Sequence, residues 1–226
     1  GPARARPLRV AAMLPEGADA VTVVFADPAR HAEHIEAGQY LTLEAPIDGE
    51  RVRRAYSLAS VPGDGGLAIT VKRVPGGLMS NWIHDRLAVG DFVRCFGPSG
   101  HFTAGPPPRG PRRLLLVAGG SGIVPLQAVA RQVLHDEPDA DVTLVYGSAS
   151  LDRAIFATAL QQLAAGERRL HLHWVFEAAP TDEGGPPFTL GRLDEPTLVK
   201  VLAGADMHGF DRAMLCGPDA MRAADR

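Results

Sequence analysis

The sequence has only two cysteines, Cys95 and Cys216, among its 226 residues. Two thiols cannot build a disulfide framework, and they are too few for a four-thiolate zinc or iron–sulfur site inside this chain. The eight histidines show no metal-ligand spacing, and none has a thiolate partner or a pair of carboxylates arranged as metal ligands would be, so we expect them to be surface or structural residues. We therefore expect no metal site within these residues.

Excess charge and long apolar runs are also missing. The formal net charge is −3, so there is no general basic excess to neutralise nucleic-acid phosphates. No window approaches the roughly 18 apolar residues of a transmembrane helix, and the arginine-containing start leads into no apolar signal core. These absences predict a cytoplasmic protein without a nucleic-acid or membrane partner. Arg51, Arg53 and Arg54 are a local exception in charge.

What is present is ordinary for a folded protein: 46% apolar and 22% charged residues. The length fits one large domain or two small ones. Residues 104–113 are rich in proline and glycine and cannot sustain helix or strand hydrogen bonds, so they separate two parts of the chain. We predict one domain over residues 1–105 and a second over residues 112–226, truncated before its last helix is complete.

The first part contains short β-rich runs punctuated by turns, which is typical of a small antiparallel barrel or sandwich. One short helix is expected at Met79–Leu87, with Ser80 as its cap. The expected strands are Leu8–Leu14, Ala20–Phe25, Tyr40–Glu44, Val52–Ala59, Leu67–Val74 and Phe92–Phe96.

In the second part, apolar strands alternate with helical stretches at even spacing, which indicates βαβ units and a parallel sheet. Ligands of such sheets bind at the carboxyl ends of the strands. The expected strands are Leu114–Ala118, Val142–Tyr146, Leu170–Val175 and Ala213–Cys216, and the expected helices are Ile123–Leu134 and Ala154–Leu163.

A glycine turn, Gly119-Gly120-Ser121-Gly122, joins the first of these strands to a helix with Pro125 in its first turn. Glycines let backbone approach a phosphate, and the N–H groups of a helix N-terminus attract its charge. The same turn can also serve packing alone. It is not the Gly-x-Gly-x-x-Gly fingerprint, and the second strand ends in Tyr146-Gly147-Ser148 without an acidic residue for a ribose.

Another candidate site is the run Arg53–Ser60. Strand alternation places Arg54 and Tyr56 on one face and Ala55 and Ser57 on the other. A guanidinium can bind a phosphate and an aromatic side chain can lie against a flat ring, although a solvated arginine and a core tyrosine would look the same. Ser57 lacks a neighbouring base and no Gly-x-Ser-x-Gly elbow occurs, so nucleophilic hydrolysis is disfavoured.

Four motifs in one order make the chain resemble the ferredoxin–NADP reductase superfamily. They are Arg54-x-Tyr56-Ser57, Gly77-x-x-Ser80, Gly119-Gly-Ser-Gly-Ile-x-Pro125 and Cys216-Gly-Pro218, and the likeness covers nearly the whole chain from about residue 8. Within the superfamily, residues 47–57 and 71–77 resemble the reductase components of multicomponent oxygenases, of the phenylacetate-CoA epoxidase reductase type. The implied fold is an antiparallel β-barrel flavin domain followed by an α/β parallel-sheet nucleotide-binding domain.

The resemblance implies two binding sites and two catalytic residues. Ser57 would hydrogen-bond near flavin N5, and Cys216 would lie where the nicotinamide approaches; the alternative for Cys216 is a small buried residue ending a strand. FAD is the expected flavin, with FMN as the alternative. The implied flavin-binding residues are Arg54, Ala55, Tyr56, Ser57, Val71, Lys72, Gly77, Leu78, Met79 and Ser80. The implied nucleotide-binding residues are Gly119, Gly120, Ser121, Gly122, Cys216, Gly217 and Pro218.

NADH is expected over NADPH, because the arginine that NADP-using relatives carry after the second strand is replaced by Ser148-Ala149-Ser150. The implied activity moves electrons from NAD(P)H through flavin to a one-electron acceptor, such as a [2Fe-2S] ferredoxin domain or protein serving an oxygenase. With two cysteines, any cluster must lie outside these residues. A regulatory module that binds flavin or nucleotide without turnover, and a domain of a larger electron-transfer protein, remain alternatives.

Overall fold

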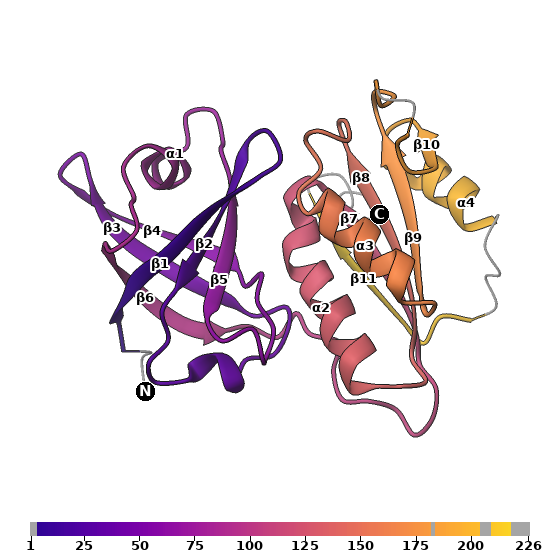
Figure 1. Ribbon diagram of the computed structural model, residues 1–226, viewed down its shortest axis with the longest axis horizontal. Helices are drawn as coiled ribbons and strands as arrows, with labels where there is room; N and C mark the ends of the chain where they lie inside the picture. The colour runs from indigo at the N-terminus through magenta and orange to yellow at the C-terminus, as the bar shows by residue number, and fades with distance from the viewer. Residues whose placement is uncertain (1–3, 182–183, 204–208, 218–226) are drawn as a thin grey trace. The chain divides into compact units, whose positions relative to one another are not determined.

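The computed structural model describes residues 4–181, 184–203 and 209–217. The chain folds into two compact units, residues 1–103 and 104–226 (Figure 1). In the described part of the chain, no helix combines the length and the apolar character needed to cross a membrane.

The described part of the first unit contains six strands in one antiparallel sheet, in the order β4-β3-β6-β1-β2-β5. A bridge between Leu58 and Ile69 links the two ends of this order, and the Ala59 N–H donates to the Ala68 carbonyl at 2.7 Å. The sheet therefore closes into a barrel. The strands are β1 Arg6–Glu16, β2 Ala20–Phe25, β3 Tyr40–Ile47, β4 Glu50–Ser57, β5 Leu67–Lys72 and β6 Phe92–Ser99.

Strand alternation fills this barrel. On β3, Leu41, Leu43 and Ala45 point into the buried apolar core, while Thr42 and Glu44 point to the outer face. A 3-10 turn, η1 (His31–Glu33), follows β2, and one helix, α1 (Leu78–Asp85), packs against β3, β4 and β5.

The predicted cap of α1 is wrong. The helix begins at Leu78 with Gly77 as its N-cap residue, so Ser80 lies inside the first turn. The Ser80 hydroxyl oxygen instead accepts a hydrogen bond from the Val74 backbone N–H at 3.1 Å, which fixes the loop before the helix. A serine can bond a nearby backbone group in a loop as well as in a cap, and the spacing alone did not separate the two cases.

In its described part the second unit has five parallel strands in the order β10-β9-β8-β7-β11. Helices α2 and α3 cover one face of the sheet. Val201 and Leu202 of α4 pack on the other face, against Leu115 and Val117. The elements are β7 Arg113–Gly119, η2 Gly120–Gly122, α2 Ile123–Asp136, β8 Asp141–Ser148, α3 Ala157–Gly166, β9 Leu170–Phe176, β10 Phe188–Leu190, α4 Glu195–Ala203 and β11 Arg212–Cys216.

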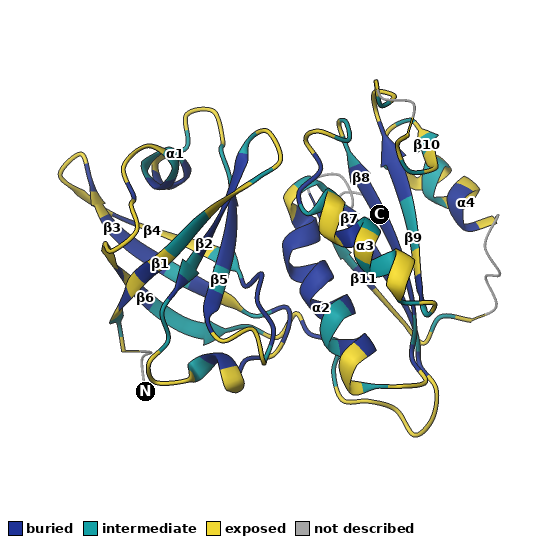
Figure 2. Cartoon of the chain, viewed as in Figure 1, coloured by how far each residue is buried: buried dark blue, intermediate teal, exposed yellow. Residues whose placement is uncertain are grey.

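Burial follows from this layering. The central strands β7 and β8 are buried along most of their length, and α2 is buried except toward its C-terminal end (Figure 2). Near-continuous apolar strands are typical of parallel sheets covered on both faces. The predicted fold class, an antiparallel barrel followed by a parallel α/β domain, is confirmed.

Candidate functional site

Arg54 and Tyr56 of the flavin motif lie on the same face of strand β4 but differ in how far they are buried. Arg54 and Tyr56 lie opposite Leu43 and Leu41 of β3, on the face of β4 that turns toward the barrel core. Tyr56 is half-buried against that core, and burial raises the pKa of its phenol to about 12 although Arg54 acts in the opposite direction. Arg54 is exposed, and one of its Nη atoms donates to the Arg53 carbonyl at 2.7 Å. An exposed cation therefore stands next to a neutral, partly covered ring.

The outer face of β4 carries the other two motif residues. Ser57 is half-buried and pairs with Tyr40 of β3, while Ala55 is exposed and pairs with Thr42. Ser57 and Tyr56 therefore point to opposite sides of the strand, as the alternation predicted. The catalytic role of Ser57 stays a prediction.

The loop between β5 and α1 is held by side chains, so its backbone is fixed in place. The Asn81 amide donates to the Gly77 carbonyl at 2.7 Å and to the Val74 carbonyl at 3.2 Å, and Arg73 donates to the Asn81 side-chain oxygen at 3.0 Å. A Cβ on Gly77 would lie 2.7 Å from the Ser80 oxygen, so a side chain there would disturb this loop. The sequence motif did not identify Arg73 and Asn81, because the Asn81 amide binds backbone groups that no side-chain pattern reveals.

The remaining residues of this loop differ in exposure. Met79 is buried in the core and Leu78 is half exposed, so only the backbone of Met79 can serve a ligand. At the end of β5, the Val71 carbonyl already bonds to the His84 ring at 2.8 Å, and Lys72 is partly exposed. Because α1 packs against β4 and β5, the Arg54-Tyr56 strand and the Gly77 loop lie in one region of the first unit.

In the second unit, the glycine turn meets the end of β11. A Cβ on Gly122 would lie 2.0 Å from the Cys216 carbonyl oxygen, and one on Gly217 would lie 2.7 Å from the Gly119 carbonyl oxygen. No side chain fits at either position. Gly120 and Gly217 also have positive φ angles, of 52° and 143°, which glycine adopts most easily.

This contact brings together residues from both ends of the second unit. Cys216 pairs with Ala118 at the carboxyl ends of β11 and β7, which is the edge where parallel sheets bind ligands. Ser121 is exposed beside the start of α2. Cys216 is half-buried, and burial raises the pKa of its thiol, so the thiol is protonated at neutral pH. The predicted residue Pro218 lies outside the described residues.

The loop after β8 carries an acidic residue that the sequence motifs did not identify. Ser148 donates to the Ser150 carbonyl at 3.1 Å, and the Ser150 hydroxyl donates to the Asp152 carboxylate. Asp152 and Arg153 are both exposed. The sequence did carry a signal, because Asp152 lies four residues after the end of β8. It was not identified because the prediction for this loop rested on the absence of the arginine that NADP-using relatives carry there.

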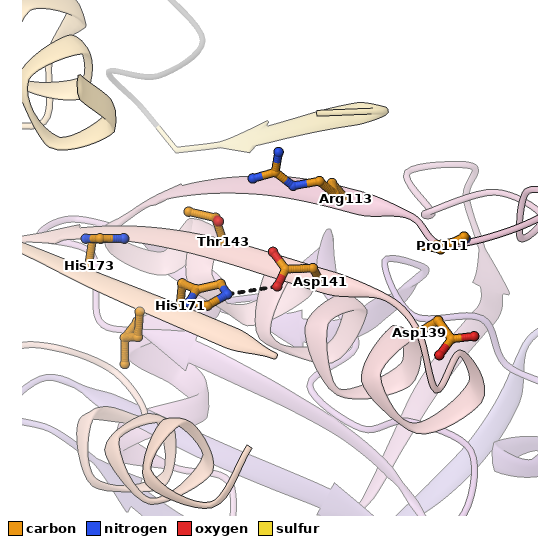
Figure 3. A pocket seen from close by; sticks show the side chains of 8 residues that line it. Pro111, Arg113, Asp139, Asp141, Thr143, His171 and His173 are labelled. Atoms are coloured by element: carbon orange, nitrogen blue, oxygen red, sulfur yellow. Dashed lines mark hydrogen bonds and ion pairs between the residues drawn. The ribbon is translucent and has the colours of Figure 1, made fainter. Parts of the chain in front are cut away.

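A pocket of about 770 Å³ lies at the opposite edge of the same sheet (Figure 3). It is lined at the starts of β7, β8 and β9 by polar side chains, and His171 Nε2 lies 2.8 Å from Asp141 Oδ2. Burial, together with the nearby His171, lowers the pKa of His173. Within the described residues, no group of three or more metal-ligand side chains is arranged to hold a metal ion. The lining residues are Pro111, Arg113, Asp139, Asp141, Thr143, His171, Leu172 and His173.

Two family models match the chain in the order of its two units. The oxidoreductase FAD-binding domain matches residues 10–104, and the oxidoreductase NAD-binding domain matches residues 116–226. Ferredoxin–NADP reductase B of Sorangium cellulosum is 34% identical over 191 residues, which cover 82% of this chain and 75% of that protein.

An epoxidase subunit and a cytochrome P450 reductase are also similar to this chain. One component of the Escherichia coli 1,2-phenylacetyl-CoA epoxidase is 34% identical over 95% of this chain. The chain spans 60% of the length of that relative. The crystal structure of a cytochrome P450 reductase from Amycolatopsis matches with a TM-score of 0.78 and 30% identity, over 98% of this chain and 65% of that one.

The two family matches include both groups of candidate site residues described above. The Arg54 strand and the Gly77 loop fall inside the FAD-binding match, and the glycine contact between β7 and β11 falls inside the NAD-binding match. The predicted class, a flavin- and nicotinamide-dependent oxidoreductase, is confirmed at the level of the family. The chain belongs to the ferredoxin–NADP reductase family, as an FAD-binding domain followed by an NAD-binding oxidoreductase domain.

Proposed function

We propose that this chain is the NAD(P)H-oxidising part of an oxygenase reductase, which passes electrons through FAD to a one-electron acceptor. The observation that carries the proposal is the close approach of Gly119 and Gly122 to Gly217 and Cys216. The carboxyl ends of β7 and β11 meet there through backbone atoms alone. This leaves room for a dinucleotide at the carboxyl ends of the strands, where parallel sheets bind such ligands. The flavin domain is proposed to span residues 1–105 and the nucleotide domain residues 112–226.

The first unit fits the flavin. Arg54 offers an exposed guanidinium for a phosphate, and Tyr56 offers a phenol that stays neutral at physiological pH. The loop before α1 offers the N–H groups of a helix start, held open by Gly77 and by the bonds of Asn81. FAD held by these residues would supply the chemistry that accepts a hydride from a nicotinamide and releases its two electrons one at a time.

The residues of this chain would bind and orient the flavin and the nicotinamide, and would neutralise the charge of a flavin phosphate. Arg54 would hold a phosphate, Tyr56 would lie against the ring system, and the Ser57 hydroxyl, on the other side of β4, would donate a hydrogen bond at flavin N5. Cys216 supplies a neutral thiol beside the nicotinamide, because burial keeps it protonated. FAD is proposed over FMN, because the Gly77 loop provides a second anion site beyond the one at Arg54.

NADH is the proposed electron donor. The Asp152 carboxylate, hydrogen-bonded to Ser150, lies in the loop after the second strand of this sheet, β8. A carboxylate there repels the extra phosphate of NADPH and accepts hydrogen bonds from a ribose. Arg153 is exposed at the approach to α3 and is proposed to belong to the start of that helix rather than to the nucleotide site.

The proposed acceptor is a [2Fe-2S] ferredoxin domain or protein that serves an oxygenase. Relatives named as reductase components of a ketosteroid monooxygenase and of an aromatic O-demethylase support an oxygenase system. The two cysteines, Cys95 and Cys216, are too few to ligate such a cluster, so the acceptor is proposed to lie outside these residues.

The proposal is tested by loading the purified chain with FAD and measuring ferricyanide reduction with NADH and with NADPH. The expected result is a yellow protein that reduces ferricyanide, with the higher kcat/KM for NADH. A protein that retains flavin but reduces no ferricyanide with either nucleotide would refute the enzymatic proposal and favour a regulatory binding module. A higher kcat/KM for NADPH would refute the assignment of the donor.

A further inference from the structure

The outer side of the barrel carries a charged surface that the flavin motif does not use. We call it the arginine face and define it as Arg9, Arg51, Arg53, Arg94 and Phe92. Arg53 on β4 and Arg94 on β6 lie opposite the same residue of β3, and Phe92 on β6 lies opposite Arg9 on β1. Four neighbouring strands therefore contribute to one continuous surface.

A buried carboxylate lies at the centre of this surface. The side chain of Glu44 is 3% exposed, and its Oε2 accepts a hydrogen bond from Arg53 Nε. Its Oε1 lies 3.3 Å from Arg94 Nη1 and 3.8 Å from Arg51 Nε. The hydrogen bond from Arg53 holds the pKa of Glu44 below its ordinary value. A buried anion of this kind needs its partners, so it keeps three guanidinium groups in place.

The arginines remain available to a partner. Their side chains are 68%, 54% and 51% exposed at Arg51, Arg53 and Arg94, and Phe92 is 67% exposed. The Arg53 guanidinium lies 4.6 Å from the centre of the Phe96 ring, which restricts its motion further. Arginine and aromatic side chains held in advance are favourable in interfaces, because little entropy is lost on binding.

We propose that the arginine face docks an acidic surface of a partner protein. The face carries four positive charges around one negative charge, on a chain whose formal net charge is −3. A small anion is a poor occupant, because Glu44 already fills the point where three guanidinium groups converge. Carboxylates spread over a protein surface can reach the outward sides of the arginines instead.

Nucleic acid fits less well. Arg53 and Arg94 both lie against the ring of Phe96, so that ring is not free for base stacking, and the whole chain repels a polyanion. Neighbouring strands lie about 4.8 Å apart, so the face is roughly 14 Å wide across four strands. That size suits a small, transient protein interface. The face lies on the side of β4 opposite Arg54 and Tyr56, which is the side that also carries Ala55 and Ser57. Peptide binding involves no turnover of the flavin, so its outcome is distinguishable from that of the proposed redox function.

The test compares matched variants of the whole chain for binding of a fluorescein-labelled oligoglutamate peptide at low ionic strength. Arg51→Ser/Arg94→Ser removes two charges and leaves Arg53 paired with Glu44. Arg30→Ser/Arg86→Ser removes two exposed arginines of the same unit outside the face. We expect the first variant to bind the peptide about fivefold more weakly than wild type, and the second within about twofold, because each exposed ion pair contributes little on its own.

Two further measurements, on a second variant and on other ligands, also test the proposal. Arg9→Ser/Phe92→Ser changes two residues of the face that are not partners of Glu44, and it should also weaken peptide binding if the first variant fails to fold. An oligothymidylate of equal charge and phosphatidylglycerol vesicles should bind more weakly than the peptide. Equal losses in the face and control variants would overturn the docking surface, and tighter binding of oligothymidylate or vesicles would overturn the protein partner.

Discussion

Replacing Gly122 by alanine should destabilise the second unit. The added Cβ would lie 2.0 Å from the Cys216 carbonyl oxygen, whereas uncrowded heavy atoms sit about 3.5 Å apart. The end of β11 would have to move by roughly 1.5 Å away from its pairing with β7, because a backbone oxygen cannot rotate aside as a side chain can. Overpacking of this kind costs about 1–3 kcal/mol, and the rigid neighbour places Gly122→Ala at the upper end.

The assay is urea unfolding followed by tryptophan fluorescence in a Trp82→Phe background, so that Trp174 reports the second unit alone. Trp174 is buried and its ring centre lies 5.2 Å from that of Tyr146. With a loss of about 3 kcal/mol and an m value of about 1–3 kcal/mol/M, the urea midpoint should fall by about 1–3 M. Gly166→Ala is the control, because nothing lies within 4 Å of its added Cβ. An unchanged midpoint for Gly122→Ala would refute the reasoning.

Three more predictions concern single side chains. Arg54→Ala should weaken FAD binding about tenfold or more, since a charged hydrogen bond contributes about 1.5–3 kcal/mol; a titration of the apoprotein that gives an unchanged Kd contradicts this. Ser57→Ala should retain FAD but slow its reduction, and stopped-flow bleaching by NADH at the wild-type rate rules the role out. Burial lowers the pKa of His173, so its contribution to stability should be complete above pH 6.5 and fall as the pH drops below it. His173→Gln should reduce that loss, measured as urea midpoints, whereas His135→Gln, at an 87% exposed site, should not.

The sequence predicted most accurately the strands and helices that show a regular period of apolar residues. Alternating strands such as Leu41–Leu43 and the apolar strand at Leu114 were found because a one-residue shift would expose the core. Strand and helix ends were less accurate: β5 stops at Lys72 rather than Val74, and α1 ends at Asp85 rather than Leu87. These ends are set by loop hydrogen bonds, which periodicity does not report.

Two elements, β10 and α4, were missed in the second unit. Strand β10 has three residues, too few for a pattern. Helix α4 did have a start signal, because Asp194 accepts a hydrogen bond from the Thr197 N–H at 3.0 Å and Pro196 lies in the first turn.

For the candidate site, the glycine motifs could be read from the sequence, because close backbone approach excludes other residues. The pairing of Gly122 with Cys216 could not, since the two lie far apart in the chain and meet only when β11 adds beside β7. The same holds for Glu44, whose arginine partners come from β4 and β6. Asp152 was missed because a carboxylate in a polar loop is ordinary until the end of β8 is placed beside it.

The central claim is that this chain holds a flavin that a nicotinamide nucleotide reduces directly. The most direct measurement is the visible absorption spectrum of the FAD-loaded chain during anaerobic titration with NADH. We predict that the flavin bands bleach with one equivalent of NADH per FAD, because one hydride carries both electrons. Bands that persist with excess NADH and with excess NADPH would contradict it.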